Sequence, residues 1–286
     1  MYLVKVLKFF LKSLIIFFTY PFTFFAILLL SEQNIYNRIF KKYFSAGLNF
    51  KCKSLLDFIK RFSFDSNYYY YPYFLKKKYI SASMGNPYEG VLTSKIYRKR
   101  GFPDEFFKTN IAYQYLIDYI NDNKFEKKII HQIGASSGRE INYFSKLSNS
   151  LKFEASDLTI EIANDIQSNY PHIESFRVDL SNKNDVRKLA ERCSLIVAFG
   201  GLQYLIPKDL KIFFEICKEN KCELIISQPI SNLYNPILLS KAMPRGLLSW
   251  SHCYLKIANK LGYKYKATTS YNSNEQNQML YAHLFS

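Results

Sequence analysis

The chain has 286 residues, 48% of them hydrophobic, so it can bury the core of one α/β domain with an added segment. Its formal net charge is +16, and residues 1–128 carry 21 Lys/Arg against 9 Asp/Glu. This basic excess predicts attraction to phosphate groups of lipids or nucleic acid, and a genome biased toward Lys, Tyr, Phe, Ile and Asn is the alternative. The five cysteines include no CxxC pair, so we expect no disulfide framework, no metal site and a reducing compartment.

An apolar segment opens the chain. Residues 13–30 contain no charged residue, and as a helix they would be about 27 Å long, barely the thickness of a bilayer core. Pro21 would bend such a helix, and no small-residue cleavage site follows it. Because basic residues flank it on both sides, we expect residues 1–30 to anchor the chain at the cytoplasmic side of a membrane, the inner membrane in bacteria. A buried helical hairpin or an unstructured apolar arm is the alternative.

The next stretch, residues 31–107, shows turn signals and predicts an extension of short helices and loops. From residue 109 an apolar spacing predicts an amphipathic helix. This helix leads into a domain that spans residues 108–286.

Strand and helix patterns alternate in that domain, and this alternation predicts a parallel α/β sheet with helices on both faces. In such sheets ligands bind at the carboxyl ends of the strands. The expected strands are residues 128–133, 151–156, 173–178, 195–199 and 223–227, and the helices between them are residues 139–147, 160–169, 183–191 and 210–219.

The first strand ends in the turn GASSG at residues 134–138. Glycines there let the backbone approach a ligand closely, and the helix start behind them offers unpaired N–H groups, so this corner predicts nucleotide binding. The turn resembles the GASSGIG of short-chain dehydrogenases, and Tyr204 and Lys208 have the spacing of that family's catalytic pair. Glu140, however, replaces the last glycine and would bring a carboxylate to the diphosphate, and Tyr204 directly follows strand four. An NAD(P)-dependent dehydrogenase is therefore the alternative.

The same turn resembles the first motif of class I S-adenosylmethionine-dependent methyltransferases, an acidic and an apolar residue followed by GxGxG. Gly134 and Gly138 match the outer glycines, and Ser136 stands for the middle one. Gln132 stands for the acidic residue. It keeps hydrogen-bonding capacity but has no charge to pair with the ammonium of the cofactor.

Later motifs of that family follow in order. Asp157, 23 residues after Gly134, matches the carboxylate that accepts from the ribose hydroxyls. Asp179 matches the acidic residue beside adenine, and residues 194–205 resemble the segment that lines the methyl-donor pocket. The resemblance implies that the cofactor is S-adenosylmethionine. It implies as cofactor-binding residues Gln132, Gly134, Ser136, Gly138, Asp157, Leu158, Asp179, Leu180, Phe199 and Gly200.

The C-terminal end resembles the same family. Residues 250–263 resemble its last helix, and residues 264–269 and 279–285 would form a hairpin that ends in an antiparallel strand. The resemblance implies a Rossmann-like sheet of seven strands, preceded by a mainly helical extension and the apolar segment.

Methyl transfer depends mainly on positioning, and an oxygen acceptor also needs a base within hydrogen-bond reach. Among the polar side chains expected near the ends of strands four and five or in the last helix, His252 and Tyr204 are the candidate catalytic residues. Gln203, Asp209 and Gln228 are further candidates.

The acceptor is suggested by a second resemblance. YEGV at residues 88–91 and LQYL at residues 202–205 are similar to segments of methyltransferases associated with bacterial cell-surface polysaccharides. This implies methylation of a hydroxyl on a glycan, a lipid-linked sugar or a small molecule at the membrane surface, with residues 31–107 as a lid. A methyltransferase fold without activity that serves as a scaffold is an alternative, motivated by Gln132 and Ser136. Nucleic acid is disfavoured as a substrate because the basic excess lies outside the catalytic half.

Overall fold

The computed structural model divides the chain into two compact units, one of residues 1–85 with 244–249 and one of residues 86–243 with 250–286. It describes residues 14, 17, 18, 20–22, 94–96, 98, 99, 111–122, 129–230, 242–244, 250–272 and 278–286.

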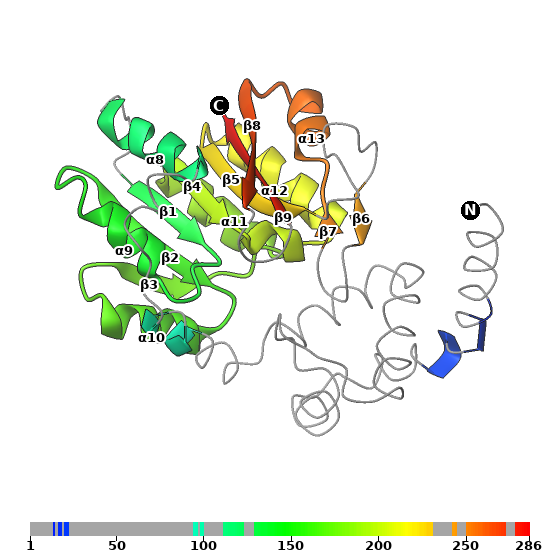
Figure 1. Cartoon of the computed structure of the whole chain (residues 1–286), viewed down its shortest axis with the longest axis horizontal. Helices are drawn as coiled ribbons and strands as arrows, with labels where there is room; N and C mark the ends of the chain where they lie inside the picture. Colours follow the sequence, from blue (N-terminus) through cyan, green and yellow to red (C-terminus); the bar gives the residue numbers. More distant parts are fainter. Residues whose placement is uncertain are drawn as a thin grey trace. The chain divides into compact units, whose positions relative to one another are not determined.

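A mixed sheet forms the centre of the second unit (Figure 1). Its order is β3-β2-β1-β4-β5-β9-β8. The strands β1 to β5 are parallel to their neighbours, whereas β9 pairs antiparallel with both β5 and β8. The strands of this sheet are β1 (Ile129–Ile133), β2 (Lys152–Asp157), β3 (Glu174–Arg177), β4 (Leu195–Phe199), β5 (Glu223–Ile230), β8 (Tyr265–Asn272) and β9 (Gln278–Phe285).

Helices cover both faces of the sheet (Figure 1). In β1, Ile130 belongs to the hydrophobic cluster with α8, α9 and α10, and Ile133 belongs to the cluster with α11, α12 and α13. The helices are α8 (Ile111–Asp122), α9 (Arg139–Ser145), α10 (Ile160–Asn169), α11 (Lys183–Arg192), the 3-10 helix η2 (Gly201–Tyr204), α12 (Pro207–Glu219) and α13 (Tyr254–Lys260). The prediction of a parallel α/β sheet with helices on both faces is confirmed.

The structure differs from the predicted elements at several boundaries, among them the start of α12 at Pro207 rather than residue 210 and the end of β8 at Asn272 rather than residue 269. The last helix was expected over residues 250–263, but Trp250–Ser251 is the short strand β7 and α13 begins only at Tyr254. His252 donates to the Leu205 carbonyl and Cys253 has ψ 73°, so the residues before Tyr254 are held outside the helix. β5 also continues to Ile230, beyond the predicted end at residue 227, because β9 pairs with it along this stretch.

In the first unit, described residues near the N-terminus are helical and expose apolar side chains. Phe17 is 75% and Phe22 78% exposed, and Leu14 and Phe18 are exposed as well. Within the described parts of the chain, no helix is both long enough and apolar enough to span a membrane. Most of the predicted anchor (1–30) and of the extension (31–107), including the YEGV turn at residues 88–91, lies outside the described residues.

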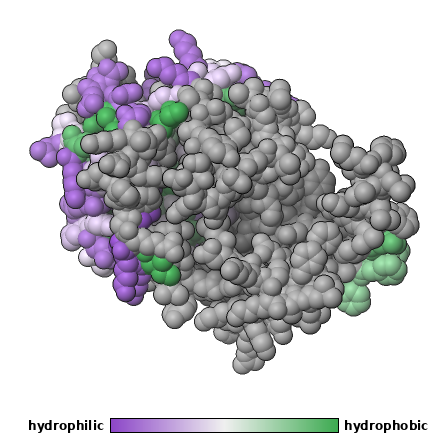
Figure 2. Space-filling model, in the orientation of Figure 1, coloured by the Kyte–Doolittle hydropathy of each residue, from purple (hydrophilic) through white to green (hydrophobic). Residues whose placement is uncertain are grey.

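On the second unit, hydrophilic residues cover most of the described surface in Figure 2.

Candidate functional site

The turn after β1 has the backbone conformation that its sequence predicts. Gly134 and Gly138 have φ of 60° and 70°, in the left-handed region that favours glycine. Ser136, at the position of the family's middle glycine, also lies there with φ 49°. The turn closes with a hydrogen bond from the Gly138 N–H to the Ala135 carbonyl, at 2.9 Å. The loop therefore keeps a glycine-type geometry despite the serine.

This turn lies against the end of β4 with no room for side chains. A Cβ on Gly134 would be 3.1 Å from Gly201 Cα, and a Cβ on Gly201 would be 3.3 Å from the Ile133 carbonyl oxygen. Gly201 directly follows the predicted Gly200, which has φ 96° and donates its N–H to the Ser227 carbonyl. Gly201 was not among the predicted binding residues, although the Gly200-Gly201 pair in the sequence marks the place.

Asp157 lies at the end of β2, beside the turn. Its Oδ2 accepts from the Ser136 N–H at 3.1 Å, and its Oδ1 accepts from the Leu158 N–H at 2.8 Å. Burial raises the pKa of this carboxyl, while the backbone N–H groups of Ser136, Leu158 and Thr159 act in the opposite sense. The structure thus brings together Asp157, Leu158 and the turn.

Asp179 follows β3, the next strand toward the sheet edge. Its Oδ1 accepts from both the N–H and the hydroxyl of Ser181, at 2.9 and 2.7 Å, which fixes the carboxylate in a local turn. The neighbouring Leu180 is half-buried and packs against the core under α11 and α12. Both residues lie at the carboxyl edge of the sheet, as predicted.

An aromatic group lies at the end of β4. The ring of Phe199 meets that of Tyr113 from α8 edge-on, with centroids 4.7 Å apart. Tyr113 in turn contacts Phe144 of α9. The predicted residue Phe199 therefore connects the strand end to two helices.

Gln132 and Glu140 lie on either side of the glycine turn, one on β1 and the other on α9. Gln132 lies on β1 and is only 2% exposed, and its Oε1 has no hydrogen-bond partner among the described residues. Its side chain hydrogen-bonds to Glu140, in the first turn of α9. Burial raises the pKa of Glu140, whereas Arg139 and the Gln132 hydrogen bond lower it. A buried acceptor and a partly buried carboxylate therefore lie together next to the glycine turn.

A segment before the sheet also contacts the turn. Ser94 is fully buried, with its hydroxyl 3.5 Å from that of Ser136. Arg98 forms an ion pair with Asp165 of α10 at 2.6 Å and reaches the Ser137 carbonyl at 3.5 Å. The sequence offers no local pattern for these contacts, since residues 94 and 136 are 42 positions apart.

The two candidate catalytic residues lie near η2. His252 is 1% exposed, and its Nε2 donates to the Leu205 carbonyl at 2.9 Å. Burial lowers the pKa of His252 to about 3, so its ring is neutral at neutral pH and a weak base. Tyr204 is half-buried at the last position of η2. The structure therefore gives His252 the surroundings of a positioning residue and leaves Tyr204 accessible at the strand-four end.

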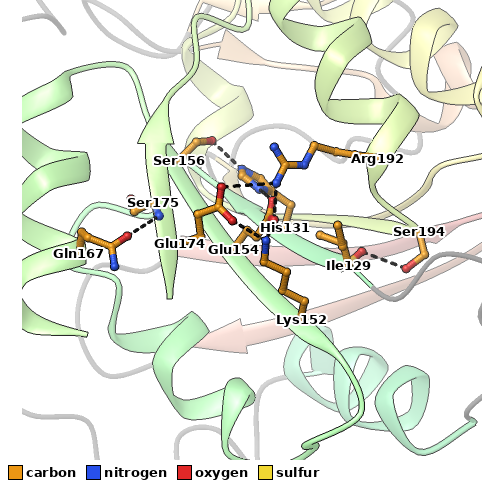
Figure 3. Close-up of polar contacts among 10 residues, drawn as sticks. All are labelled: Ile129, His131, Lys152, Glu154, Ser156, Gln167, Glu174, Ser175, Arg192 and Ser194. Atoms are coloured by element: carbon orange, nitrogen blue, oxygen red, sulfur yellow. Dashed lines mark hydrogen bonds and ion pairs between the residues drawn. The ribbon is translucent and has the colours of Figure 1, made fainter. Parts of the chain in front are cut away.

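A separate polar cluster surrounds His131, whose side chain lies on the face of β1 opposite to that of Gln132 (Figure 3). His131 Nε2 is 2.8 Å from the Ser156 hydroxyl, and its Nδ1 is 3.4 Å from Glu154 Oε2. Lys152 and Arg192 both pair with Glu154 Oε1. Burial alone would raise the pKa of Glu154, but these partners together hold it at about 2.

This cluster contains donors of the types that bind metals. Side-chain donor atoms of His131, Glu154 and Cys193 lie within 4.8 Å of one another. The imidazole and the carboxylate are already engaged with Ser156, with each other and with Arg192. Two cationic side chains, those of Lys152 and Arg192, thus offset the charge of the buried Glu154 carboxylate without a metal ion.

Neither a protein-family model nor a curated protein sequence matches this chain. Among solved structures, the methyltransferase domain of bacterial CtHen1 is similar at 15% identity and a TM-score of 0.45, covering 62% of this chain and 100% of that one. A TehB-like SAM-dependent methyltransferase from Corynebacterium glutamicum is similar at 16% and 0.43, over 68% of this chain and 97% of that one. An S-adenosylmethionine dependent methyltransferase from Mesorhizobium loti is similar at 10% and 0.42, over 63% and 100%. At these identities and TM-scores the likeness carries no argument about activity.

Proposed function

We propose that this chain is an S-adenosylmethionine-dependent methyltransferase. The observation that carries the proposal is the position of Asp157, whose carboxylate follows β2 and accepts from the Ser136 N–H in the adjacent glycine turn. Nucleosides bind in parallel sheets at such strand ends, where a carboxylate can accept from the ribose hydroxyls. The antiparallel entry of β9 between β5 and β8 supports the same proposal, because the family that the sequence resembles has an antiparallel final strand.

The residues present fit this cofactor, which supplies an electrophilic methyl group on a sulfonium. Gly134 and Gly201 have no side chains, so the turn after β1 packs directly against the end of β4 and the two loops of the proposed site lie together. Asp157 would accept from the ribose and Asp179 would lie toward the adenine. The buried Oε1 of Gln132 offers an acceptor that no described residue satisfies.

A dinucleotide fits the same corner less well. The diphosphate of NAD(P) carries two negative charges, and Glu140 would place a third beside them. Lys208, the second member of the dehydrogenase-like pair, is exposed in the first turn of α12 rather than part of a long helix after β5. Both observations favour the methyltransferase over the dehydrogenase.

For the acceptor, we propose a hydroxyl on a glycan, a lipid-linked sugar or a small molecule at the cytoplasmic membrane surface. The exposed side chains of Leu14, Phe17, Phe18 and Phe22 have the spacing of one helix face, which suits insertion into a lipid interface. The basic excess of residues 1–128 would add attraction to anionic lipids. Tyr204 is then the residue nearest the acceptor, and His252 holds the backbone beside it.

Calorimetric titration of S-adenosylmethionine into the full-length chain tests the cofactor. We expect micromolar binding, and a loss of at least about tenfold in Asp157→Ala, because hydrogen bonds to a charged group are worth about 1.5–3 kcal/mol. NADH and NADPH are titrated in parallel. Transfer of a labelled methyl group to lipid and glycan extracts of membranes then tests the acceptor.

The outcomes separate the alternatives. Binding of NADH or NADPH without S-adenosylmethionine would establish the dehydrogenase instead. A folded chain that binds none of these ligands would be a scaffold. If the label appears only in RNA and is removed by ribonuclease, RNA rather than a glycan would be the acceptor.

A further inference from the structure

The acceptor oxygen of Gln132 is the starting point. This residue is 2% exposed and its Oε1 has no hydrogen-bond partner among the described residues, while its side chain hydrogen-bonds to Glu140. A carboxylate only accepts hydrogen bonds, so the amide NH₂ must donate to it and Oε1 is left as an acceptor. Buried acceptors in folded proteins are nearly always satisfied. A donor that arrives with a ligand would complete this one.

Glu140 lacks the two close cations that the buried Glu154 has. Its Oε1 is 3.7 Å from the Arg139 guanidinium, and its side chain is 14% exposed. By contrast, Glu154 has both Lys152 at 3.0 Å and Arg192 in contact with the same oxygen. Glu140 is therefore a carboxylate with partial access to solvent, and Arg139 at 3.7 Å is the one cation that the described residues place near it.

Its position is set by the turn that holds the proposed cofactor. Glu140 follows the left-handed Gly138 by two residues and lies in the first turn of α9. Burial raises the pKa of the Tyr113 hydroxyl, and the charge of Glu140 is the second cause. The ring of Tyr113 packs against that of Phe199 at the end of β4. Glu140 and Gln132 thus lie near the carboxyl ends of β1 and β4.

We propose that Glu140, with Gln132 Oε1 beside it, binds the ammonium of the cofactor's amino-acid end and selects a cationic head group over a diphosphate. The inference rests on the proposed function. Where the resembled family has its acidic residue, this chain has Gln132, and the missing charge stands eight positions later. An ammonium has three donors, enough for both oxygens.

The test compares two ligands that differ only at that end. S-Adenosylmethionine has the amino-acid end, and 5′-methylthioadenosine keeps the adenine, ribose and sulfur without it. In Glu140→Gln of the full-length chain, we expect S-adenosylmethionine to bind about tenfold more weakly or worse and methylthioadenosine to bind within about twofold of the unaltered chain. The exposed Glu191→Gln removes the same charge from α11 and should change neither affinity.

A charge swap supplies the second variant. Gln132→Glu combined with Glu140→Gln returns the carboxylate to the family's position, and we expect it to recover most of the lost affinity for S-adenosylmethionine. Thermal unfolding checks that each variant is folded. If Glu140→Gln fails to fold, the double variant alone must still bind S-adenosylmethionine more tightly than methylthioadenosine by the factor seen in the unaltered chain.

Three results would overturn the inference. An unchanged affinity of Glu140→Gln for S-adenosylmethionine would show that this carboxylate does not meet the cofactor. An equal loss for both ligands would give Glu140 a structural role only. If the unaltered chain bound neither ligand, the proposed function itself would fail and the inference with it.

Discussion

The backbone N–H of Ser136 donates to Asp157 Oδ2 at 3.1 Å, and together with the bond from the Ala135 N–H to the Ser156 carbonyl it joins the turn after β1 to the end of β2. Because β1 and β2 are paired in parallel up to Ile133 and Ser156, the two segments leave the sheet side by side. The carboxylate that is proposed to hold the ribose therefore also fixes the loop on which the rest of the cofactor would lie.

Affinity for S-adenosylmethionine should fall as the pH is lowered. Burial raises the pKa of Asp157, so the carboxyl takes up a proton at a higher pH than in the unfolded chain. The protonated form loses acceptor capacity toward the ribose hydroxyls, and binding weakens through that pKa. Titrations between about pH 8 and about pH 5 would measure this, and Asp157→Asn should bind weakly with little dependence on pH.

The same pKa predicts the opposite sign for folding. A carboxyl whose pKa is raised on folding adds stability at low pH, and this contribution is lost as the pH rises through the folded pKa. Asp157→Asn should therefore cost less than about 1 kcal/mol in unfolding free energy at neutral pH, although it abolishes most binding. A large loss of stability in urea denaturation would contradict this separation.

Gly138→Ala should destabilise the chain more than Gly262→Ala does. Both glycines have φ of 70°, so both variants bear the same backbone strain. The new Cβ at residue 138 would lie 2.8 Å from Ile166 Cγ2, whereas nothing lies within 4 Å at residue 262. We expect a difference of about 1–3 kcal/mol in unfolding free energy. Equal losses in the two variants would mean that Ile166 moves aside at no cost.

Glu154→Gln should remove a large part of the chain's sensitivity to acid. His131, Lys152 and Arg192 outweigh the burial of Glu154 and hold its pKa at about 2, below the unfolded value of 4.5. Its contribution to stability is thus present above pH 4.5 and lost as the pH falls toward 2. At neutral pH the variant should lose about 3 kcal/mol. Denaturation curves across this pH range should be steeper for the unaltered chain, and parallel curves would count against the network.

Arg98→Gln should cost more stability than Lys211→Gln. The Arg98–Asp165 pair has side chains only 15% and 13% exposed, whereas Lys211 and its partner Glu215 are 60% and 35% exposed. Surface pairs of the second kind contribute well under about 1 kcal/mol, and we expect about 1–2 kcal/mol for the first. Limited proteolysis near Ser94 should also become faster in Arg98→Gln alone, because Arg98 joins this segment to α10 and to the Ser137 carbonyl.

The alternation of apolar runs and helical patterns was enough to predict β1 to β5 and the place of the glycine turn. These features depend on local sequence, since a buried parallel strand is a short apolar run and the turn needs residues that tolerate positive φ. Asp157 and Asp179 follow their strands directly, so their positions at the sheet edge could also be predicted from local sequence.

Contacts between distant residues could not be predicted in this way. Ser94 and Arg98 reach the turn from outside the sheet, and no sequence pattern near them predicts contacts with Ser136 or Asp165. His252 was expected at a helix start, but its bond to the Leu205 carbonyl keeps it outside α13 and buried. That outcome depends on the packing of η2 against the segment after β7, which no local pattern encodes.

The place of β9 also governs the order in which this sheet can be built during synthesis. Among the strands that the structure describes, β8 pairs only with β9, and β9 connects it to β5. The ribosome makes β8 first, yet β8 has no neighbour until residues 278–285 have emerged and paired with β5. Until then the antiparallel edge of β5 stays open to strands of other nascent chains. A ribosome stalled before residue 278 should therefore carry a chain whose parallel half is formed and whose β5 edge binds chaperones.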